Sequence, residues 1–476
     1  MTAPSDQFRR RLGTAALLVV ILAVYLMEAH ARRVVFPTGP MQGDQAAYLQ
    51  YARGISETGY SFVGDRNRMP GYPFLLSLIY RQGSSDAEFL ARAQTFNVNL
   101  TAALLLLLFF LLRLHFSRLV SLAWVAATAF GVFIYRAPLA QTEVTFYVIG
   151  FGMFLCFWRM FVAPNPWLAV WTGCLAGVAH LFKASVLPAL AIFLVVFAVK
   201  IIRAPGRLRA ALQLALVLLC FLAVVFPYLQ TSKRVFGHYF YNVNSTFYFW
   251  CDSWAEAAAL TRAHGDRTGW PTLPPEQIPS AAKYWREHSF ADIAARLTNG
   301  FIATITHNAR VEGYWKYALL LSLAAGIVAL RQRKEAMALL REQPFPALFV
   351  ALFFAAYVLL YSWFERMTGD SRFVLALFLP FVFSLSKLIQ CLVVRRTTPL
   401  AGRAVTVLSA LTGLVMLFAA FDAVFVAAQL RQRVPAKARA TSGISRLDQS
   451  EVAALPAIHD IHARVPRIEK NEELPV

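Results

Sequence analysis

The chain has 476 residues, of which 58% are hydrophobic, 14% aromatic and only 15% charged. A typical soluble domain is about 45–50% apolar and about 25% charged, so this composition excludes an ordinary soluble protein and predicts an integral membrane protein. The formal net charge of +20 would suggest a nucleic-acid partner for a soluble protein. Here the basic residues lie at the ends of apolar runs, where they set topology and contact membrane lipids, so we expect no nucleic-acid partner.

The cysteines and histidines give no sign of a disulfide framework or a metal site. Four of the five cysteines lie inside apolar runs, only Cys251 lies in a long polar segment, and the sequence has no CxxC pair. The pair His459-x-x-His462 near the C-terminus lacks a third ligand, so we predict no metal there.

The first apolar run follows Arg9-Arg10-Arg11, as in a signal peptide. The run from Leu12 to about Ala29 is long for such a peptide, and no small-residue cleavage site closes it. We therefore expect an uncleaved first membrane span.

Apolar runs of roughly 17–25 residues predict the membrane spans, because only a helix of that length satisfies its own backbone across the hydrocarbon core. The predicted fold class is therefore an all-α polytopic membrane protein with about eleven transmembrane helices. The runs at 119–135 and 167–182 are short. All eleven runs lie near residues 12–35, 94–112, 119–135, 143–162, 167–182, 185–202, 210–229, 314–330, 345–364, 372–393 and 404–428.

Basic residues in the short connections predict the orientation. One set of connections, including 200–209 and 331–334, is basic almost throughout, and we expect it to face the cytoplasm. The protein is therefore expected in the cytoplasmic (inner) membrane as a multi-pass protein. An odd number of spans puts the C-terminal tail outside, whereas the tail's own basic residues favour the inside, so its side stays open. The extracytoplasmic face then carries the connections 36–93, 136–142, 230–313 and 365–371.

Four regions are expected along the chain. They are an N-terminal transmembrane catalytic module at 1–228 that includes the outer loop 36–93, an extracytoplasmic segment at 229–313, a C-terminal transmembrane module at 314–428 and a flexible tail at 429–476.

Interfacial helices are predicted in the large first outer loop, after Pro70, and in the second outer segment, where Ala281–Leu297 has the pattern of one amphipathic helix. The second segment is also rich in aromatic residues, notably His238–Tyr241 and Phe247–Trp250. Such residues form an interfacial belt, or they stack on sugar rings and pack on a lipid tail, and the sequence leaves both uses open.

Asp44 is the candidate catalytic residue of the first outer loop. It follows Gly43 and precedes a helix start at Ala46, so its carboxylate is either an N-cap or a general base at the membrane surface. We expect the surrounding low dielectric to raise its pKa toward that of a useful base.

The same loop carries cations and aromatic residues suited to a phosphate-bearing lipid. Arg68 precedes Pro70 and offers a planar, permanently charged fork that matches phosphate oxygens, although it would serve equally for headgroup contact. We assign Tyr48, Arg66 and Tyr72 to substrate binding.

Further charges are expected at the same membrane face. Glu143 begins a span and is a second candidate acid, or the partner of a loop arginine such as Arg136. Lys183 lies between two spans and Arg372 opens a late one. We assign both to donor phosphate binding, with snorkelling of Lys183 and an Asp370–Arg372 ion pair as the plainer alternatives.

The distribution of charge separates two kinds of membrane protein. Charged residues within the spans are nearly absent, with Asp422 as the main exception. A transporter is expected to carry ionisable groups near the bilayer midplane. Charges gathered at one face instead favour an enzyme that acts on a lipid-linked substrate.

In their order, these residues resemble the GT-C superfamily of glycosyltransferases, of the aminoarabinose-transferase and protein O-mannosyltransferase type, together with related bacterial lipopolysaccharide sugar transferases. The resemblance covers most of residues 12–393. Individual motifs are short, so their order and the topology carry the likeness. The motifs are Asp44, Arg68-Met-Pro-Gly-Tyr-Pro-Phe74, Gln141-Thr-Glu143, His180-Leu-Phe-Lys183 and Arg372-Phe373 ahead of Pro380.

The resemblance implies a multi-span helical fold, a polyprenyl-phosphate sugar donor and transfer to a hydroxyl acceptor on lipid or protein at the outer face. Asp44 then matches the first-loop catalytic acid and Glu143 the second acidic position. Arg68 stands where relatives often carry Lys, and Arg372-Phe373 resembles a late Arg-Tyr pair. The family often has an acidic pair where this chain has Asp44 alone, so the need for a divalent cation stays open and no cofactor is assigned.

Two other functions stay open at this point. One is a translocator of lipid-linked glycans whose outer charges form a gate. The other is a glycan ligase or polymerase that uses polyprenyl-diphosphate donors.

Overall fold

The computed structural model describes residues 4–39, 44–64, 67–203, 206–264, 273–274, 276–308, 314–395 and 401–444. Within them all regular structure is helical and there is no strand, which confirms the all-α class. The chain divides into two units, 1–426 and 427–476, and the helix bundle belongs to the first. The predicted boundaries at 228 and 313 stay predictions.

Nine helices in the described part of the chain are long and apolar enough to cross a membrane, which confirms a polytopic helical protein. The two further predicted spans are the helices α8 (Pro166–Phe182) and α15 (Trp315–Arg331), each of 17 residues. Such a helix is about 26 Å long, whereas the hydrocarbon core is about 30 Å thick. The eleven predicted spans are therefore not confirmed. The nine are Arg11–Val35, Asp86–Arg113, Arg118–Arg136, Glu143–Val162, Val186–Arg203, Arg207–Phe236, Pro344–Phe364, Ser371–Val394 and Leu408–Arg433.

Apart from the short helix α18, these spans fall in ten labelled helices and one π-helical turn. They are α1 (Pro4–Val35), α4 (Asp86–Arg113), α5 (Arg118–Thr128), the π-helical turn η1 (Ala129–Phe133), α6 (Ile134–Arg136), α7 (Glu143–Val162), α9 (Val186–Arg203), α10 (Arg207–Phe236), α17 (Pro344–Phe364), α19 (Phe378–Arg395) and α20 (Ala401–Ile444). The span that ends in α19 begins with the short helix α18 (Ser371–Leu375).

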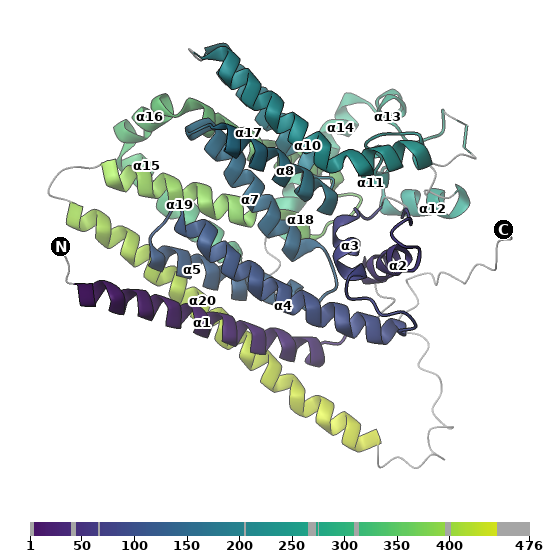
Figure 1. Cartoon of the computed structure of the whole chain (residues 1–476), viewed down its shortest axis with the longest axis horizontal. Helices are drawn as coiled ribbons and strands as arrows, with labels where there is room; N and C mark the ends of the chain where they lie inside the picture. Colours follow the sequence, from purple (N-terminus) through teal and green to yellow (C-terminus); the bar gives the residue numbers. More distant parts are fainter. Residues whose placement is uncertain are drawn as a thin grey trace. The chain divides into compact units, whose positions relative to one another are not determined.

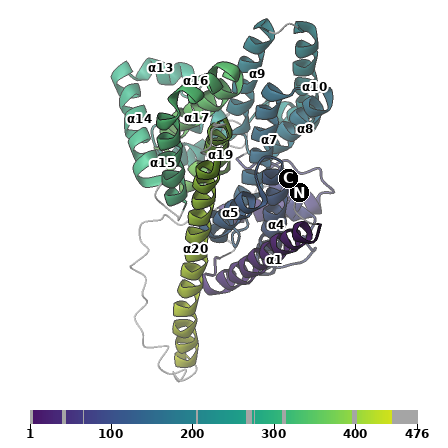
Figure 2. The same cartoon turned by 90° about the vertical axis from the view of Figure 1, so that its left-hand side faces the viewer.

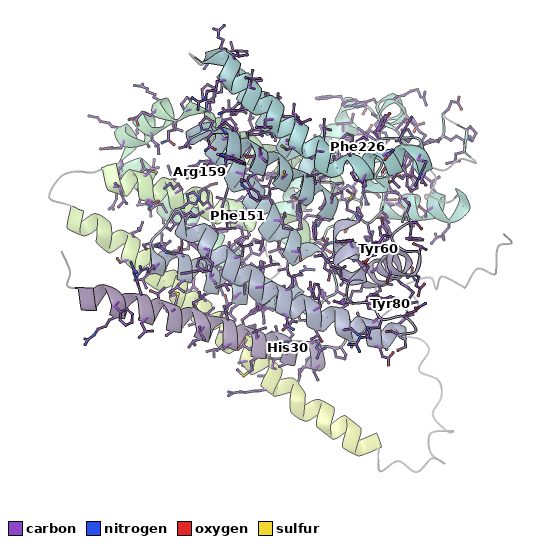
Figure 3. All side chains as sticks on the ribbon, viewed as in Figure 1. His30, Tyr60, Tyr80, Phe151, Arg159 and Phe226 are labelled. Carbon is purple, nitrogen blue, oxygen red and sulfur yellow. The ribbon has the colours of Figure 1, made fainter. Side chains whose placement is uncertain are left out.

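Several shorter elements lie between the spans, and Figure 1 shows α2, α3, α11 and α12 at one end of the bundle and α16 toward the other. These elements are α2 (Asp44–Glu57), α3 (Gly71–Ser77), α11 (Val243–Thr246), the 3-10 turn η2 (Tyr248–Trp250), α12 (Trp254–His264), α13 (Ala281–Glu287), α14 (Phe290–Ala303), the π-helical turn η3 (Thr304–Asn308) and α16 (Arg333–Glu342). Figure 3 agrees, since Tyr60 and Tyr80 lie at the α2–α3 end and Arg159 lies toward the far end of α7.

The predicted amphipathic helix at Ala281–Leu297 is two helices, so that prediction was wrong in its continuity. Ser289 starts α14 with a capping box, in which its hydroxyl accepts from the Asp292 N–H and the Asp292 carboxylate accepts from the Ser289 N–H. The new N-terminus stabilises a break after α13. Figure 2 shows α14 beside α17. A Cβ at Gly300 would lie 1.8 Å from the Ser362 carbonyl oxygen, so only glycine allows this approach.

Small residues also fix α8, the helix that leads to the predicted phosphate-binding lysine. A Cβ at Gly173 would lie 2.3 Å from the Val217 carbonyl oxygen of α10, and a Cβ at Gly177 one turn later would lie 2.7 Å from Val224 Cβ. This Gly-x-x-x-Gly spacing allows two membrane helices to touch through their backbones. At the other end, a Cβ at Gly71 of α3 would lie 2.8 Å from the Leu181 carbonyl oxygen. The C-terminus of α8 is thus held between α10 and α3.

Candidate functional site

A cavity of about 730 Å³ opens among α2, α7, α9, α17, α18 and the segment that carries α11 and η2. Its volume falls in the range usual for small-molecule sites. One part is charged and the other is apolar and aromatic. The charged lining residues in the described part of the chain are Asp44, Arg68, Glu143, Lys183 and Arg372.

The two carboxylates stand at the first residues of two helices that are tied to each other. Asp44 begins α2 and Glu143 begins α7. The next residue of α2, Gln45, accepts a hydrogen bond from the Ala140 N–H at 2.9 Å, and its amide donates to Thr38 Oγ1 at 3.0 Å. The start of α2 is therefore fixed to the turn that leads into α7.

The carboxylate of Asp44 bridges two arginines that lie 24 and 328 positions away in the sequence. Its Oδ1 accepts from Arg68 and its Oδ2 accepts from Arg372, and the side chain is 20% exposed. Burial alone would raise the pKa of Asp44, but Arg68 and Arg372, with Lys183 further off, outweigh it and hold that pKa below its ordinary value. The expectation of a raised pKa was wrong because it included only the effect of the low dielectric and omitted the ion pairs with Arg68 and Arg372.

Glu143 lies deeper than Asp44 and is only 2% exposed. Its Oε1 is 3.5 Å from Lys183 Nζ and 3.6 Å from Arg372 Nη1. Its Oε2 is buried and accepts no hydrogen bond from the residues that the structure describes. Glu143 thus offsets part of the positive charge of Lys183 and Arg372, and its Oε2 can still accept a hydrogen bond from a ligand.

Arg372 is held by Asp370, which does not line the cavity. The Arg372 Nε is 3.0 Å from Asp370 Oδ2, and the Arg372 N–H donates to Asp370 Oδ1 at 2.9 Å. Arg136 lies 3.6 Å from the same carboxylate and donates to Ser371 at 2.9 Å. The predicted Asp370–Arg372 pair is confirmed, and it leaves Nη1 of Arg372 directed at both Asp44 and Glu143.

Arg68 is held by a side chain that sequence reasoning missed. Its Nη1 donates to Asn67 Oδ1 at 2.6 Å, and Asn244 in α11 donates to the same oxygen at 3.0 Å. No local pattern indicated that α11 would hold the segment before α3, because Asn67 and Asn244 are 177 positions apart.

Lys183 directly follows the C-terminus of α8. Its ammonium lies 5.2 Å from the ring centroid of Phe373 and 5.5 Å from that of Phe146, and its side chain is 18% exposed. Burial lowers the pKa of Lys183, and Glu143 opposes that change. An anion entering the cavity would act in the same sense as Glu143 and hold the lysine charged.

The three residues assigned to substrate binding have different positions. Tyr48 lines the cavity, 5.8 Å beneath the Arg68 guanidinium. Tyr72 is fully buried, packs edge-on against Tyr48 at 5.2 Å and donates to Asn97 Oδ1 at 3.1 Å. The contacts of Tyr72 are those of a support for Tyr48 and not of a cavity wall. Arg66 lies outside the described residues.

The rest of the cavity wall is apolar and aromatic. Phe249 and Trp250 of η2 line it, and Trp363 of α17 anchors them by donating its indole N–H to the Phe249 carbonyl at 2.7 Å. This part of the cavity offers flat rings and aliphatic groups beside the charges. Its larger apolar lining residues are Phe182, Leu187, Pro188, Phe249, Trp250, Trp254, Leu360, Tyr361, Phe364, Met367 and Phe373.

The charged part of the cavity holds two carboxylates and three cations, which leaves one formal positive charge in excess. Such a site can bind an anion and can accept a proton beside it. Among the described residues, no group of three or more His, Cys, Asp or Glu side chains is placed to hold a metal ion. Comparisons with family models and with curated protein sequences found no match to the chain.

Proposed function

We propose that the chain is a membrane glycosyltransferase that moves a sugar from a polyprenyl-phosphate donor to a hydroxyl acceptor on a lipid or protein. The observation that carries the proposal is one cavity in which three cations and two carboxylates adjoin a long apolar and aromatic wall. A phosphate, an isoprenoid chain and a sugar ring each find a suitable surface there. A GT-C fold is proposed with it.

The charge balance favours a monophosphate donor over a diphosphate. A sugar joined to a polyprenyl monophosphate carries one negative charge at its phosphodiester, which equals the single excess positive charge of the cavity. A diphosphate donor would bring at least two negative charges and leave one of them uncompensated in a partly apolar site, which is costly. The ligase or polymerase function therefore fits this cavity less well.

The reaction proposed is a one-step displacement. The acceptor oxygen forms a bond to the sugar carbon C1 while the bond from C1 to the phosphate oxygen breaks. The acceptor proton passes to Asp44, and the electron pair of the broken bond leaves with the polyprenyl phosphate, which becomes a dianion. Attack from the face opposite the phosphate inverts the anomeric centre. Glu143 orients the acceptor or the sugar through its free oxygen.

The cations supply the largest stabilisation, because the leaving phosphate gains a charge in a site with little water. Arg68 and Arg372 offer planar forks whose backbones belong to different elements, and Lys183 adds a point charge. Arg372 contacts both carboxylates, so it links the phosphate to the proton acceptor.

The proposed location is the extracytoplasmic face of the cytoplasmic membrane. Support comes from the position of α2 and α3 at one end of the bundle and of the basic helix α16 toward the other. Basic connections remain on the cytoplasmic side of membrane proteins.

The test is transfer by purified protein in detergent, offered a panel of polyprenyl-phosphate and polyprenyl-diphosphate sugars, with products identified by mass. The proposal predicts sugar transfer without a sealed bilayer and release of a lipid monophosphate. Movement of an intact lipid-linked sugar across vesicles, without bond cleavage, would establish the translocator instead. Release of a diphosphate would establish the ligase.

A further inference from the structure

The three cations of the cavity are occupied before any substrate arrives. Both oxygens of Asp44 are engaged, one by Arg68 and the other by Arg372. A carboxylate that bridges two guanidinium groups has the geometry in which two oxygens of a phosphate would be held. The proposed base and the proposed phosphate thus need the same two arginines.

The arginines are held in place by groups other than Asp44. Arg68 is fixed through Asn67, which Asn244 also contacts. Arg372 is fixed through Asp370 on the side away from the cavity. Both forks would therefore stay where they are if the carboxylate of Asp44 turned away. A site whose donors survive the loss of one ligand is ready to accept another.

The carboxylate of Asp44 is the ligand most easily replaced. It is 20% exposed and lines the cavity, whereas Glu143 is 2% exposed and lies more than 3.4 Å from its own cations. Glu143 can therefore stay as the fixed counter-charge while Asp44 moves. Exchange of the Asp44 carboxylate for a singly charged phosphate also leaves unchanged the charge that faces the two arginines.

We propose that Asp44 holds the phosphate position in the resting protein, and that a phosphate group displaces its carboxylate from Arg68 and Arg372. The displaced carboxylate is then free to take the acceptor proton. This inference rests on the proposed function only for the identity of the phosphate-bearing substrate. It makes base activation a consequence of donor binding, so an empty site carries a poor base and has little tendency to act on water.

The experiment is isothermal titration of purified protein with inorganic phosphate, and in a second arm with geranylgeranyl phosphate. Asp44→Asn removes the competing anion, so it should bind inorganic phosphate at least tenfold more tightly than the unaltered protein. Asp86→Asn is the matched control, because Asp86 begins α4, pairs with Arg53 and does not line the cavity. It removes the same charge and should change affinity less than twofold. Tighter binding of geranylgeranyl phosphate than of inorganic phosphate assigns the site to a lipid phosphate.

Adding Arg68→Gln to Asp44→Asn should abolish the gain, because the fork that receives the phosphate is gone. Equal or weaker phosphate binding by Asp44→Asn would overturn the exchange, as would an equal gain in Asp86→Asn. Sugar transfer without the gain would leave the proposed function standing and the exchange wrong. Tighter phosphate binding by Asp44→Asn without any sugar transfer by the unaltered protein would leave the exchange standing and the proposed function wrong.

A second measurement uses the unaltered protein and needs no variant to fold. Carbodiimide coupling to an amine labels accessible carboxyl groups, and peptide mass spectrometry gives the extent at each residue. Saturating sulfate, used because phosphate consumes the reagent, should raise the labelling of Asp44 at least threefold and leave Asp86 unchanged. Unchanged or reduced labelling of Asp44 would contradict displacement.

Discussion

Two carboxylates of this protein, those of Asp422 and Asp44, make ion pairs of opposite character. Asp422 of α20 is 5% exposed, pairs with Lys316 and accepts from the Tyr317 hydroxyl at 2.6 Å. Asp422 does not line the large cavity, and its one negative charge is balanced by the one positive charge of Lys316. Asp44 lines the cavity and belongs to a group with more cations than acids.

The comparison separates an ion pair that holds two helices together from a group of charges that can bind a ligand. The Asp422 pair joins α15 to α20, and close packing surrounds it: a Cβ at Gly131 in η1 would lie 3.0 Å from the Tyr317 ring. Removing one partner there leaves a buried charge unpaired. Removing Asp44 leaves its arginines with Asn67, Asp370 and room for another anion. The first change should damage the fold and the second the reaction.

The largest expected effect is on transfer by Asp44→Asn. Loss of a general base reduces rates by roughly 10²–10⁴-fold, and we expect a loss near the middle of that range with an almost unchanged unfolding temperature. Initial rates with the active donor from the panel, beside Asp86→Asn, measure it. Turnover of Asp44→Asn within threefold of the unaltered protein would remove Asp44 from the chemistry.

A smaller loss of kcat than for Asp44→Asn is expected for Arg372→Gln. Removing one stabilising donor of a developing charge costs about 10²–10³-fold in kcat. Arg366→Gln is the control, because Arg366 lies on the same connection, is 40% exposed and does not line the cavity. Steady-state kinetics should show the loss for Arg372→Gln alone, and an equal loss in both variants would argue for a general effect of charge.

Asp422→Asn should act on stability. Breaking one side of a buried ion pair costs about 3 kcal/mol or more, which should lower the unfolding temperature measured by intrinsic fluorescence in detergent. The double variant with Lys316→Met should recover much of the loss, because no buried charge is then unpaired. Phosphate binding per folded molecule should stay unchanged. Loss of phosphate binding at full stability would break the comparison.

The smallest effect is in the pH dependence. In the free protein Arg68 and Arg372 hold the pKa of Asp44 below its ordinary value, so its carboxylate stays ionised, and its stabilisation is lost only as the pH falls through that lowered pKa. With phosphate bound, those cations face the phosphate, and Lys183, Glu143 and Tyr48 remain nearby.

The pKa of Asp44 should therefore rise in the complex. The acid limb of kcat, which reports the complex, should lie about one pH unit or more above that of kcat/KM, which reports the free protein. Coincident limbs would contradict the exchange.

Sequence patterns located the helices well and their partners poorly. The apolar run at 143–162 coincides with α7 because a change from polar to apolar residues marks its ends. The span count stays unconfirmed at α8 and α15, because composition shows an apolar run but not whether a helix of 17 residues crosses the membrane.

The charged residues of the site could be predicted from their positions at the ends of spans, but the contacts that they make with one another could not be predicted. Asp44 meets a residue 328 positions away, and no local pattern specifies such a pair. The pKa of Asp44 was misjudged for the same reason. Tyr72 is of a residue type that often binds substrates, but its hydroxyl donates a hydrogen bond to Asn97 inside the fold.

The most direct test is a structure of the protein with a hydrolysis-resistant phosphonate analogue of a polyprenyl-phosphate sugar. We expect phosphonate oxygens within hydrogen-bonding distance of Arg68 and Arg372, the isoprenoid against the apolar wall near Leu187 and Phe364, and the Asp44 carboxylate turned toward the sugar. A phosphonate bound elsewhere, with Asp44 still bridging both arginines, would contradict the exchange and the proposed role of the two arginines together.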